Sequence, residues 1–207
     1  MKRLIFTCAI ALALPLRVFA AEEEGFTSIF DGKTFAGWKM ANENTNTWKI
    51  EEGAFVTRGS RCHLFYTGDE TPFKDFELKV DVMTEPASNG GIYFHTKYQE
   101  TGWPKYGFET QVNVSGGDWK RTGSVYDVAM LGTTPAKDNE WWTQHITVQG
   151  NKVSVRINGV LVLQYMEPPG VQPGKDFTRK LDEGTFALQA HDPKSVVRYK
   201  NIRVKRL

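Results

Sequence analysis

The segment "HITVQGNKVSVRINGVLVLQY" (residues 145–165) decides the fold class, because it spells out three consecutive β-strands. Its residues alternate in character with the period of two that places strand side chains on opposite faces. The dipeptides Gly150-Asn151 and Asn158-Gly159 separate the three runs, and such pairs form the two-residue turns of β-hairpins. We therefore predict an antiparallel meander with strands at 144–149, 152–157 and 160–165.

Short runs rich in β-branched and aromatic residues recur along the rest of the chain, bounded by Gly, Asn, Asp and Pro. They predict strands at Trp48–Ile50, Ala54–Thr57, His63–Tyr66, Phe76–Thr84, Gly91–His95, Phe108–Val114, Thr185–His191 and Val196–Lys205. Because no long segment shows a helical period, the predicted fold is an all-β sandwich or barrel. Two irregular stretches, 116–139 and 166–183, interrupt the pattern, and loops of that length are often functional.

The first twenty residues have the composition of an export signal. Lys2 and Arg3 precede an apolar run at 4–16, and small residues near position 20 supply a cleavage site. The run is shorter than the roughly 20 apolar residues of a membrane-spanning helix. We predict cleavage after Ala20, which removes 20 of the 207 residues and leaves a single secreted or periplasmic domain at 21–207.

Loss of this leader also sets the charge and cysteine content of the mature chain. The formal net charge changes from +2 to −1, because three basic residues and no acidic residue are removed. A nearly neutral surface argues against nucleic acid or an anionic membrane as the partner. Cys62 is then the sole cysteine, which excludes an intrachain disulfide and a Cys-based zinc site. The oligomeric state has no signature in the sequence.

The segment "KYGFETQVNV" (105–114) carries an unusual row of polar side chains. Glu109, Gln111 and Asn113 share one face of this strand, while the opposite face is mostly apolar. The strands predicted at 91–95 and 185–191 have the same two-sided character. If the three strands are neighbours in one sheet, their polar faces form one surface, which contains Tyr93, His95, Glu109, Gln111, Gln189 and His191.

Several phrases of the chain form a recognisable series, among them "FTSIFDGKTFAGWK" (26–39), "NGGIYFHT" (89–96), "YGFETQV" (106–112) and "EGTFALQAHDPKSVVRYKNIRVKRL" (183–207). They resemble the 3-keto-disaccharide hydrolase domain family over nearly the whole mature chain. The resemblance implies a concanavalin A-like jelly-roll of two curved antiparallel sheets. It also implies cleavage of glycosidic bonds in sugars oxidised at carbon 3, by hydrolysis or by elimination across carbons 1 and 2. Many members of that family have Arg at the position of His95.

A single acid on the polar row suits that chemistry better than ordinary glycoside hydrolysis. Concanavalin A-like endoglucanases place acids at i, i+2 and i+4 of one strand, and about 5–5.5 Å separates the two carboxyls of a retaining enzyme. Here these positions are Glu109, Gln111 and Asn113, of which the first alone can ionise. A ketone at carbon 3 acidifies the proton on carbon 2, so one base and one electrophile suffice.

Two arrangements of the site follow from these residues. In the first, His95, Glu109 and His191 bind a divalent metal (Mn, Co, Zn or Ca) that polarises the keto group. In the second, no metal binds, the same residues act as base and hydrogen-bond donors, and Tyr126 is the acid. The predicted substrate contacts are Tyr93, Trp103, Gln111, Lys120, Arg121 and Gln189. His63 and His145 are assigned structural roles, and Arg179 with Lys180 a solvated face.

Two other functions use the same surface. A non-catalytic carbohydrate-binding module needs aromatic rings and amides, but it has no use for a Glu flanked by two His. A conventional glycosidase is disfavoured by the amides at 111 and 113. The expected partner in each case is an oligosaccharide or glycoside, without nucleic acid and without membrane insertion.

Overall fold

The computed structural model describes residues 23–207, so the predicted leader at 1–20 lies outside the described residues. The described part contains thirteen strands and one short 3₁₀ helix at Thr45–Thr47. The strands are β1 (Thr27–Ser28), β2 (Trp38–Met40), β3 (Trp48–Glu51), β4 (Ala54–Thr57), β5 (Cys62–Tyr66), β6 (Phe76–Thr84), β7 (Gly90–Thr96), β8 (Phe108–Val112), β9 (Trp142–Gln149), β10 (Lys152–Ile157), β11 (Val160–Met166), β12 (Thr185–Ala190) and β13 (Val197–Arg206). Over residues 23–207, helices with the length and apolar character needed to cross a membrane are absent.

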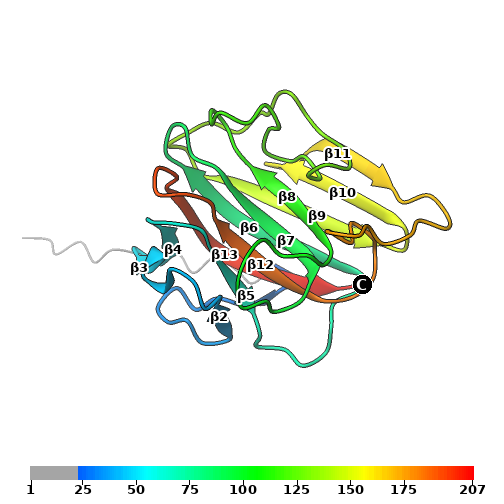
Figure 1. Ribbon diagram of the computed structural model, residues 1–207, viewed down its shortest axis with the longest axis horizontal. Coiled ribbons are helices and arrows are strands. Elements are labelled where there is room, and N and C mark those ends of the chain that lie inside the picture. The colour runs from blue at the N-terminus through cyan, green and yellow to red at the C-terminus, as the bar shows by residue number, and fades with distance from the viewer. Residues whose placement is uncertain (1–22) are drawn as a thin grey trace, which may run out of the picture.

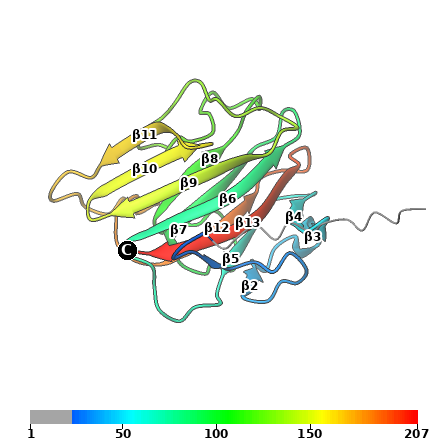
Figure 2. The same ribbon diagram turned by 180° about the vertical axis from the view of Figure 1, so that it is seen from behind.

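The strands form two antiparallel sheets that lie one over the other (Figures 1 and 2). One sheet has the order β11-β10-β9-β6-β13-β4-β3, with β1 beside β13. The other has the order β2-β5-β12-β7-β8. The prediction of an all-β sandwich is therefore confirmed, and the three strands with polar faces are indeed neighbours, as β12, β7 and β8.

The meander at 144–165 forms as predicted. Gly150-Asn151 joins β9 to β10, and Asn158-Gly159 joins β10 to β11. β9 begins two residues earlier than predicted, at Trp142, whose ring is buried while that of Trp141 is exposed. β1 and β2 were not predicted, because they are short and lack an alternating pattern.

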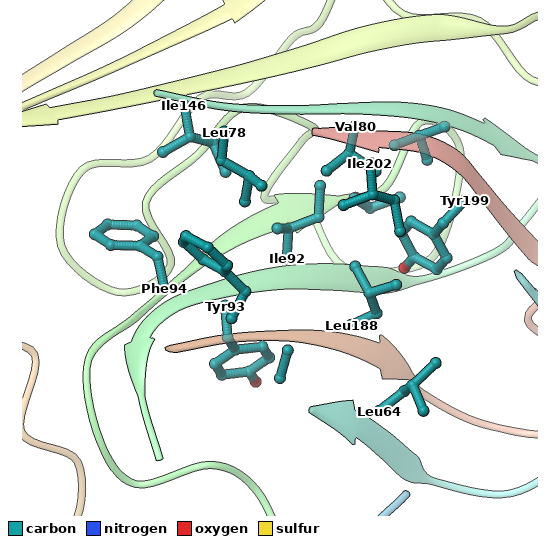
Figure 3. Close-up of a cluster of buried hydrophobic side chains, with 14 of the residues drawn as sticks. Leu64, Leu78, Val80, Ile92, Tyr93, Phe94, Ile146, Leu188, Tyr199 and Ile202 are labelled. Carbon is teal, nitrogen blue, oxygen red and sulfur yellow. The ribbon is translucent and has the colours of Figure 1, made fainter. Parts of the chain in front are cut away.

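The core lies between the two sheets. Leu78 and Val80 on β6 face Ile92 on β7 and Leu188 on β12, and all four side chains are buried (Figure 3). Burial of a side chain of this size contributes about 1.5–3 kcal/mol relative to exposure. Tyr93 follows Ile92 and points to the other side of β7 (Figure 3). The core therefore fixes which residues of β7 face outward.

The outer faces of the two sheets differ. β6 and β9 alternate between buried inner residues and half-exposed outer residues, as expected for a solvated outer face. By contrast, β7 and β8 are buried on both faces. Three loops provide this cover: the Trp103 loop (residues 97–107), the 113–141 loop, and a strap (residues 167–184) between β11 and β12. The three loops thus cover the polar row on the outer face of this sheet.

Candidate active site

A pocket of about 290 Å³ lies over the outer face of β12, β7 and β8. It is lined by seven of the predicted residues, namely Tyr93, Trp103, Glu109, Gln111, Tyr126, Gln189 and His191. The other lining residues are Asn89, Pro104, Gly107, Asp118, Asp127, Phe177 and Arg179. Most of the predicted polar surface is therefore one site.

The register of the sheet brings the central residues together. Glu109 on β8 lies opposite Tyr93 on β7, and Gln111 lies opposite Gly91. Gly91 in turn lies opposite Gln189 on β12. Because side chains of like parity share a face, these residues point into the same space.

Glu109 accepts hydrogen bonds from both neighbouring side chains. Tyr93 Oη donates to Glu109 Oε2 at 2.8 Å, and Gln189 Nε2 donates to Glu109 Oε1 at 3.0 Å. Gln189 Nε2 also lies 3.1 Å from Tyr93 Oη. Tyr93, Glu109 and Gln189, from three neighbouring strands, thus form a hydrogen-bonded triad that holds the carboxylate at the base of the pocket.

Gly91 makes room for this arrangement. A Cβ atom on Gly91 would lie 2.3 Å from Glu109 Oε1 and 2.9 Å from Glu109 Cδ. These distances are too short for any side chain, so Glu109 can lean across β7 toward Gln189 only because position 91 is glycine.

Burial sets the basicity of Glu109, which is 8% exposed. Burial raises the pKa of Glu109 from 4.5 to about 7, while the hydrogen bonds from Tyr93 and Gln189 and the charge of Arg179 act to lower it. A carboxylate with a pKa near 7 is a stronger base than an ordinary carboxylate, and about half of it is still ionised at pH 7.

His191 lines the pocket just beyond the end of β12. Its Nδ1 lies 2.8 Å from Asp192 Oδ2, so a carboxylate orients the ring, and among residues 23–207 no hydrogen bond engages Nε2. The Trp103 ring lies against it, with 5.3 Å between centroids. An imidazole oriented in this way can donate or accept a proton in the pocket.

Tyr126 lies between two cationic side chains. Lys120 Nζ is 3.9 Å from the centre of its ring, and the Arg179 guanidinium is 5.5 Å from it on the strap side. Arg179 also donates to the Tyr126 carbonyl and, at 3.2 Å, to Asp127 Oδ2. Asp127 is bound by Lys120 as well, at 2.7 Å. The pocket wall therefore carries a cluster of paired charges, in which Asp127 is bound by both Lys120 and Arg179.

The prediction that His95 shares this face is wrong. The pairing of β7 with β12 shifts between Thr96↔Thr185 and Tyr93↔Ala187, so β7 carries one extra residue there. His95 has a left-handed backbone, with φ of 54°. This bulge breaks the alternation and turns the side chain away from the pocket.

His95 instead joins two backbone segments. Its Nδ1 accepts from the Asp182 N–H at 3.3 Å, which leaves the Nε2 proton to donate to the Lys74 carbonyl at 2.9 Å. Phe76 and Phe94 pack against the ring, and burial lowers the pKa of His95. The residue thus anchors the end of the strap.

The predicted metal triad is consequently not assembled. His95 lies outside the pocket, and both oxygens of Glu109 are occupied by donors. In the described range, no cluster of three or more His, Cys, Asp or Glu side chains is arranged to hold a metal ion. Residues 95, 109 and 191 therefore do not fit the first of the two predicted arrangements, in which they bind a divalent metal together.

Lys120 and Arg121, which we predicted to contact the substrate, do not line the pocket. Lys120 acts through its ion pair with Asp127. Arg121 donates to Asn113 Oδ1 at 3.2 Å and to two carbonyls of the same loop. Asn113, on the predicted polar row, is fully buried, and its side chain makes four hydrogen bonds that hold that loop in place.

Several pocket residues on the loops were not predicted, although Trp103 and Tyr126, which also lie on loops, were. Arg179 was assigned to a solvated face, yet it lines the pocket with Phe177 from the strap. Asp118 and Asp127 add two acids that no strand pattern could place. The signal available was the length of the two irregular stretches, which indicated function without identifying side chains.

Sequence comparison finds a match to a family described as the 3-keto-alpha-glucoside-1,2-lyase-like domain over residues 25–205. A relative from Bacteroides thetaiotaomicron named 3-keto-disaccharide hydrolase is 32% identical over 81 residues. That alignment covers 35% of this chain and 28% of the relative, so it spans less than a third of the relative's length.

Comparison of structures supports the fold. A crystal structure of a presumed glycosyl hydrolase from Parabacteroides distasonis has a TM-score of 0.73 at 24% identity, covering 89% of this chain and 94% of that chain. Carbohydrate-binding module CBM66 of Bacillus subtilis has a TM-score of 0.59 at 15% identity, covering 82% and 95% respectively. These likenesses confirm the concanavalin A-like jelly-roll as the fold.

Proposed function

The chain belongs to the 3-keto-alpha-glucoside-1,2-lyase-like domain family, and on that basis we propose that it is a carbohydrate-active enzyme that cleaves 3-keto-glycosides. The observation that carries the proposal is the buried Glu109 carboxylate, whose pKa is raised to about 7. A group that merely binds sugar hydroxyls gains nothing from this basicity, whereas a base that removes a carbon-bound proton requires it.

The reaction begins at carbon 2 of the oxidised sugar. Glu109 takes the proton from carbon 2, and the electron pair left there is delocalised into the ketone at carbon 3 as an enolate. The pair then forms the double bond between carbons 1 and 2 while the bond from carbon 1 to the aglycone oxygen breaks. The aglycone oxygen receives a proton and leaves as an alcohol. Addition of water across the double bond gives the free 3-keto sugar.

Other residues of the pocket fit the remaining roles. Arg179 is a cation on the wall and can stabilise the enolate oxygen. His191, oriented by Asp192, can donate the proton to the leaving oxygen, and Tyr126 is the second candidate for this role. Gln111 has a buried Oε1 with no partner within the described residues, so it can accept from a sugar hydroxyl.

A direct test follows proton transfer at carbon 2. Methyl 3-keto-glucoside and its unoxidised parent are incubated in D₂O with the wild type and with Glu109→Gln, and products and deuterium at carbon 2 are measured by NMR. We expect turnover of the keto sugar alone, with loss of about 10²–10⁴-fold in kcat for Glu109→Gln. Glu140→Gln, whose side chain is 64% exposed on the 113–141 loop, is the matched control.

The same assay separates the alternatives. Turnover of the unoxidised parent would contradict the substrate class. Activity lost with chelator and restored by Mn²⁺, Co²⁺, Zn²⁺ or Ca²⁺ would require a metal held by residues other than the predicted triad. Export through the leader at 1–20 stays a prediction, which cell fractionation and N-terminal sequencing would test.

A non-catalytic binding module is the second candidate, favoured by one observation. Trp103 and Phe177 place aromatic rings on the pocket wall, and such rings stack on the apolar faces of sugars. If keto sugar binds without turnover, and if Trp103→Ala abolishes binding while Glu109→Ala does not, the module is the correct function.

A further inference from the structure

His63 on β5 is a buried histidine that the proposed mechanism does not use. It lies opposite Gln189 in the sheet, so it continues the row of outward-facing residues that lines the pocket. Its side chain is fully buried, and neither ring nitrogen has a hydrogen-bond partner within the described residues. The structural role that we predicted from the sequence supplies no reason for a polar ring at this position.

The missing partners define what His63 can bind. Burial lowers the pKa of His63 to about 3, so the ring is neutral and offers one N–H donor and one nitrogen acceptor. The neighbouring Gln189 Oε1 is also buried without a partner within the described residues. Leaving such groups unpaired is costly, and they are complementary to a sugar hydroxyl, which both donates and accepts.

The His63 ring packs among the rings of Phe65, Tyr93 and Trp103, of which Trp103 alone lies on a loop. The Trp103 ring lies edge-on to His63, with 5.5 Å between centroids, and it also contacts His191 in the pocket. The Arg61 guanidinium lies 5.0 Å from the Trp103 ring and pairs with Glu43 at 3.0 Å. Edge-on and tilted ring contacts and the Arg61 guanidinium thus hold the Trp103 ring, while the Gly102 N–H of the same loop donates to Glu43 Oε1 at 3.1 Å.

We propose that the pocket continues beneath Trp103, and that His63 contacts a second sugar ring of the substrate when the Trp103 loop moves aside. This inference rests on the proposed function, because it names where the substrate extends beyond the keto sugar. The subsite is uncharged and takes a hydroxylated ring, with Trp103 available to stack on that ring once displaced.

The test compares two substrates with His63→Phe, which keeps the ring size and removes both nitrogens. The substrates are a 3-keto-disaccharide and methyl 3-keto-glucoside. We expect the ratio of kcat/KM for the disaccharide to that for the methyl glycoside to fall about 3- to 10-fold, because one neutral hydrogen bond is lost. Dissociation constants for both sugars, measured in the Glu109→Gln background, should show the same selective loss.

Stability provides the second readout. A buried polar group without partners destabilises the free protein, so His63→Phe should leave Tm unchanged or raise it. An unchanged substrate ratio, or a marked fall in Tm, would overturn the proposal and assign His63 to the fold. Failure of the wild type to turn over methyl 3-keto-glucoside would instead refute the proposed function.

Discussion

Replacement of Glu109 by Gln should make the protein more stable at alkaline pH while it destroys activity. Burial raises the pKa of Glu109 from 4.5 to about 7. At 1.36 kcal/mol per pKa unit, this shift corresponds to about 3.4 kcal/mol. Because the folded-state pKa is the higher one, the free energy of unfolding falls as the pH rises from about 4.5 through 7. The side-chain amide of the Glu109→Gln variant does not titrate, so the variant does not lose this stability as the pH rises.

The measurement is urea unfolding of wild type and Glu109→Gln at pH 5 and pH 8. The difference in free energy of unfolding between the two proteins excludes the contributions of all other titrating groups, because both proteins share them. This difference should shift in favour of the variant by about 2.5 kcal/mol from pH 5 to pH 8. A constant offset of about 1 kcal/mol against the variant is expected, because the amide cannot accept from both Tyr93 and Gln189. Glu140→Gln, an exposed control, should stay within about 0.5 kcal/mol throughout.

The kinetic counterpart is the pH dependence of kcat/KM for a 3-keto-glucoside. The profile should rise with an apparent pKa near 7, since the base acts in its ionised form. A stability difference that is flat from pH 5 to pH 8 would show that the carboxylate is well solvated. That result would refute the argument that burial creates the base, whatever the activity of the variant.

Two further substitutions test the surroundings of this carboxylate, and a third tests the anchor of the strap. Tyr93→Phe removes a hydrogen bond that lowers the pKa of Glu109, so the apparent pKa of kcat/KM should rise by about one unit, and an unchanged profile would contradict this role. Gly91→Ala places a Cβ atom 2.3 Å from Glu109 Oε1, so kcat should fall by about 10²-fold while circular dichroism stays that of the wild type; full activity would show that the carboxylate can sit elsewhere. His95→Phe leaves the Asp182 N–H without its acceptor and should cost about 1–3 kcal/mol in urea unfolding, a cost that vanishes if the strap is anchored by other contacts.

The sequence predicted the parts of the site that lie on regular strands. Alternation in "KYGFETQVNV" placed Glu109 and Gln111 on one face, and the turn dipeptides fixed the meander that forms much of the other sheet. These predictions succeeded because the period of two holds wherever a strand is unbroken. They also identified β12, β7 and β8 as a group before their pairing was known.

The errors lie where backbone regularity ends. At His95 an extra residue in β7 reverses the parity, and no pattern of apolar residues signals a bulge in a strand that is buried on both faces. Arg179 reaches the pocket from the strap, which is tied to the Trp103 loop by a hydrogen bond from the Thr178 N–H to the Lys105 carbonyl at 2.8 Å. Contacts between loops that are remote in sequence produce no periodic residue pattern from which they could be predicted.

The loops, rather than the strands, determine what the polar face can do chemically. On an open sheet, Glu109 would be hydrated and would have a pKa near its ordinary value, about 2.5 units below that of the covered carboxylate. Complete burial without hydrogen-bond donors would raise the pKa of Glu109 further and leave the carboxyl protonated at neutral pH. Tyr93, Gln189 and Arg179 prevent this by stabilising the ionised form. A carboxylate that is a stronger base than usual and still partly ionised near pH 7 therefore requires the cover and the donors together. The loops thus raise the proton affinity of a carboxylate that the jelly-roll sheet holds in place.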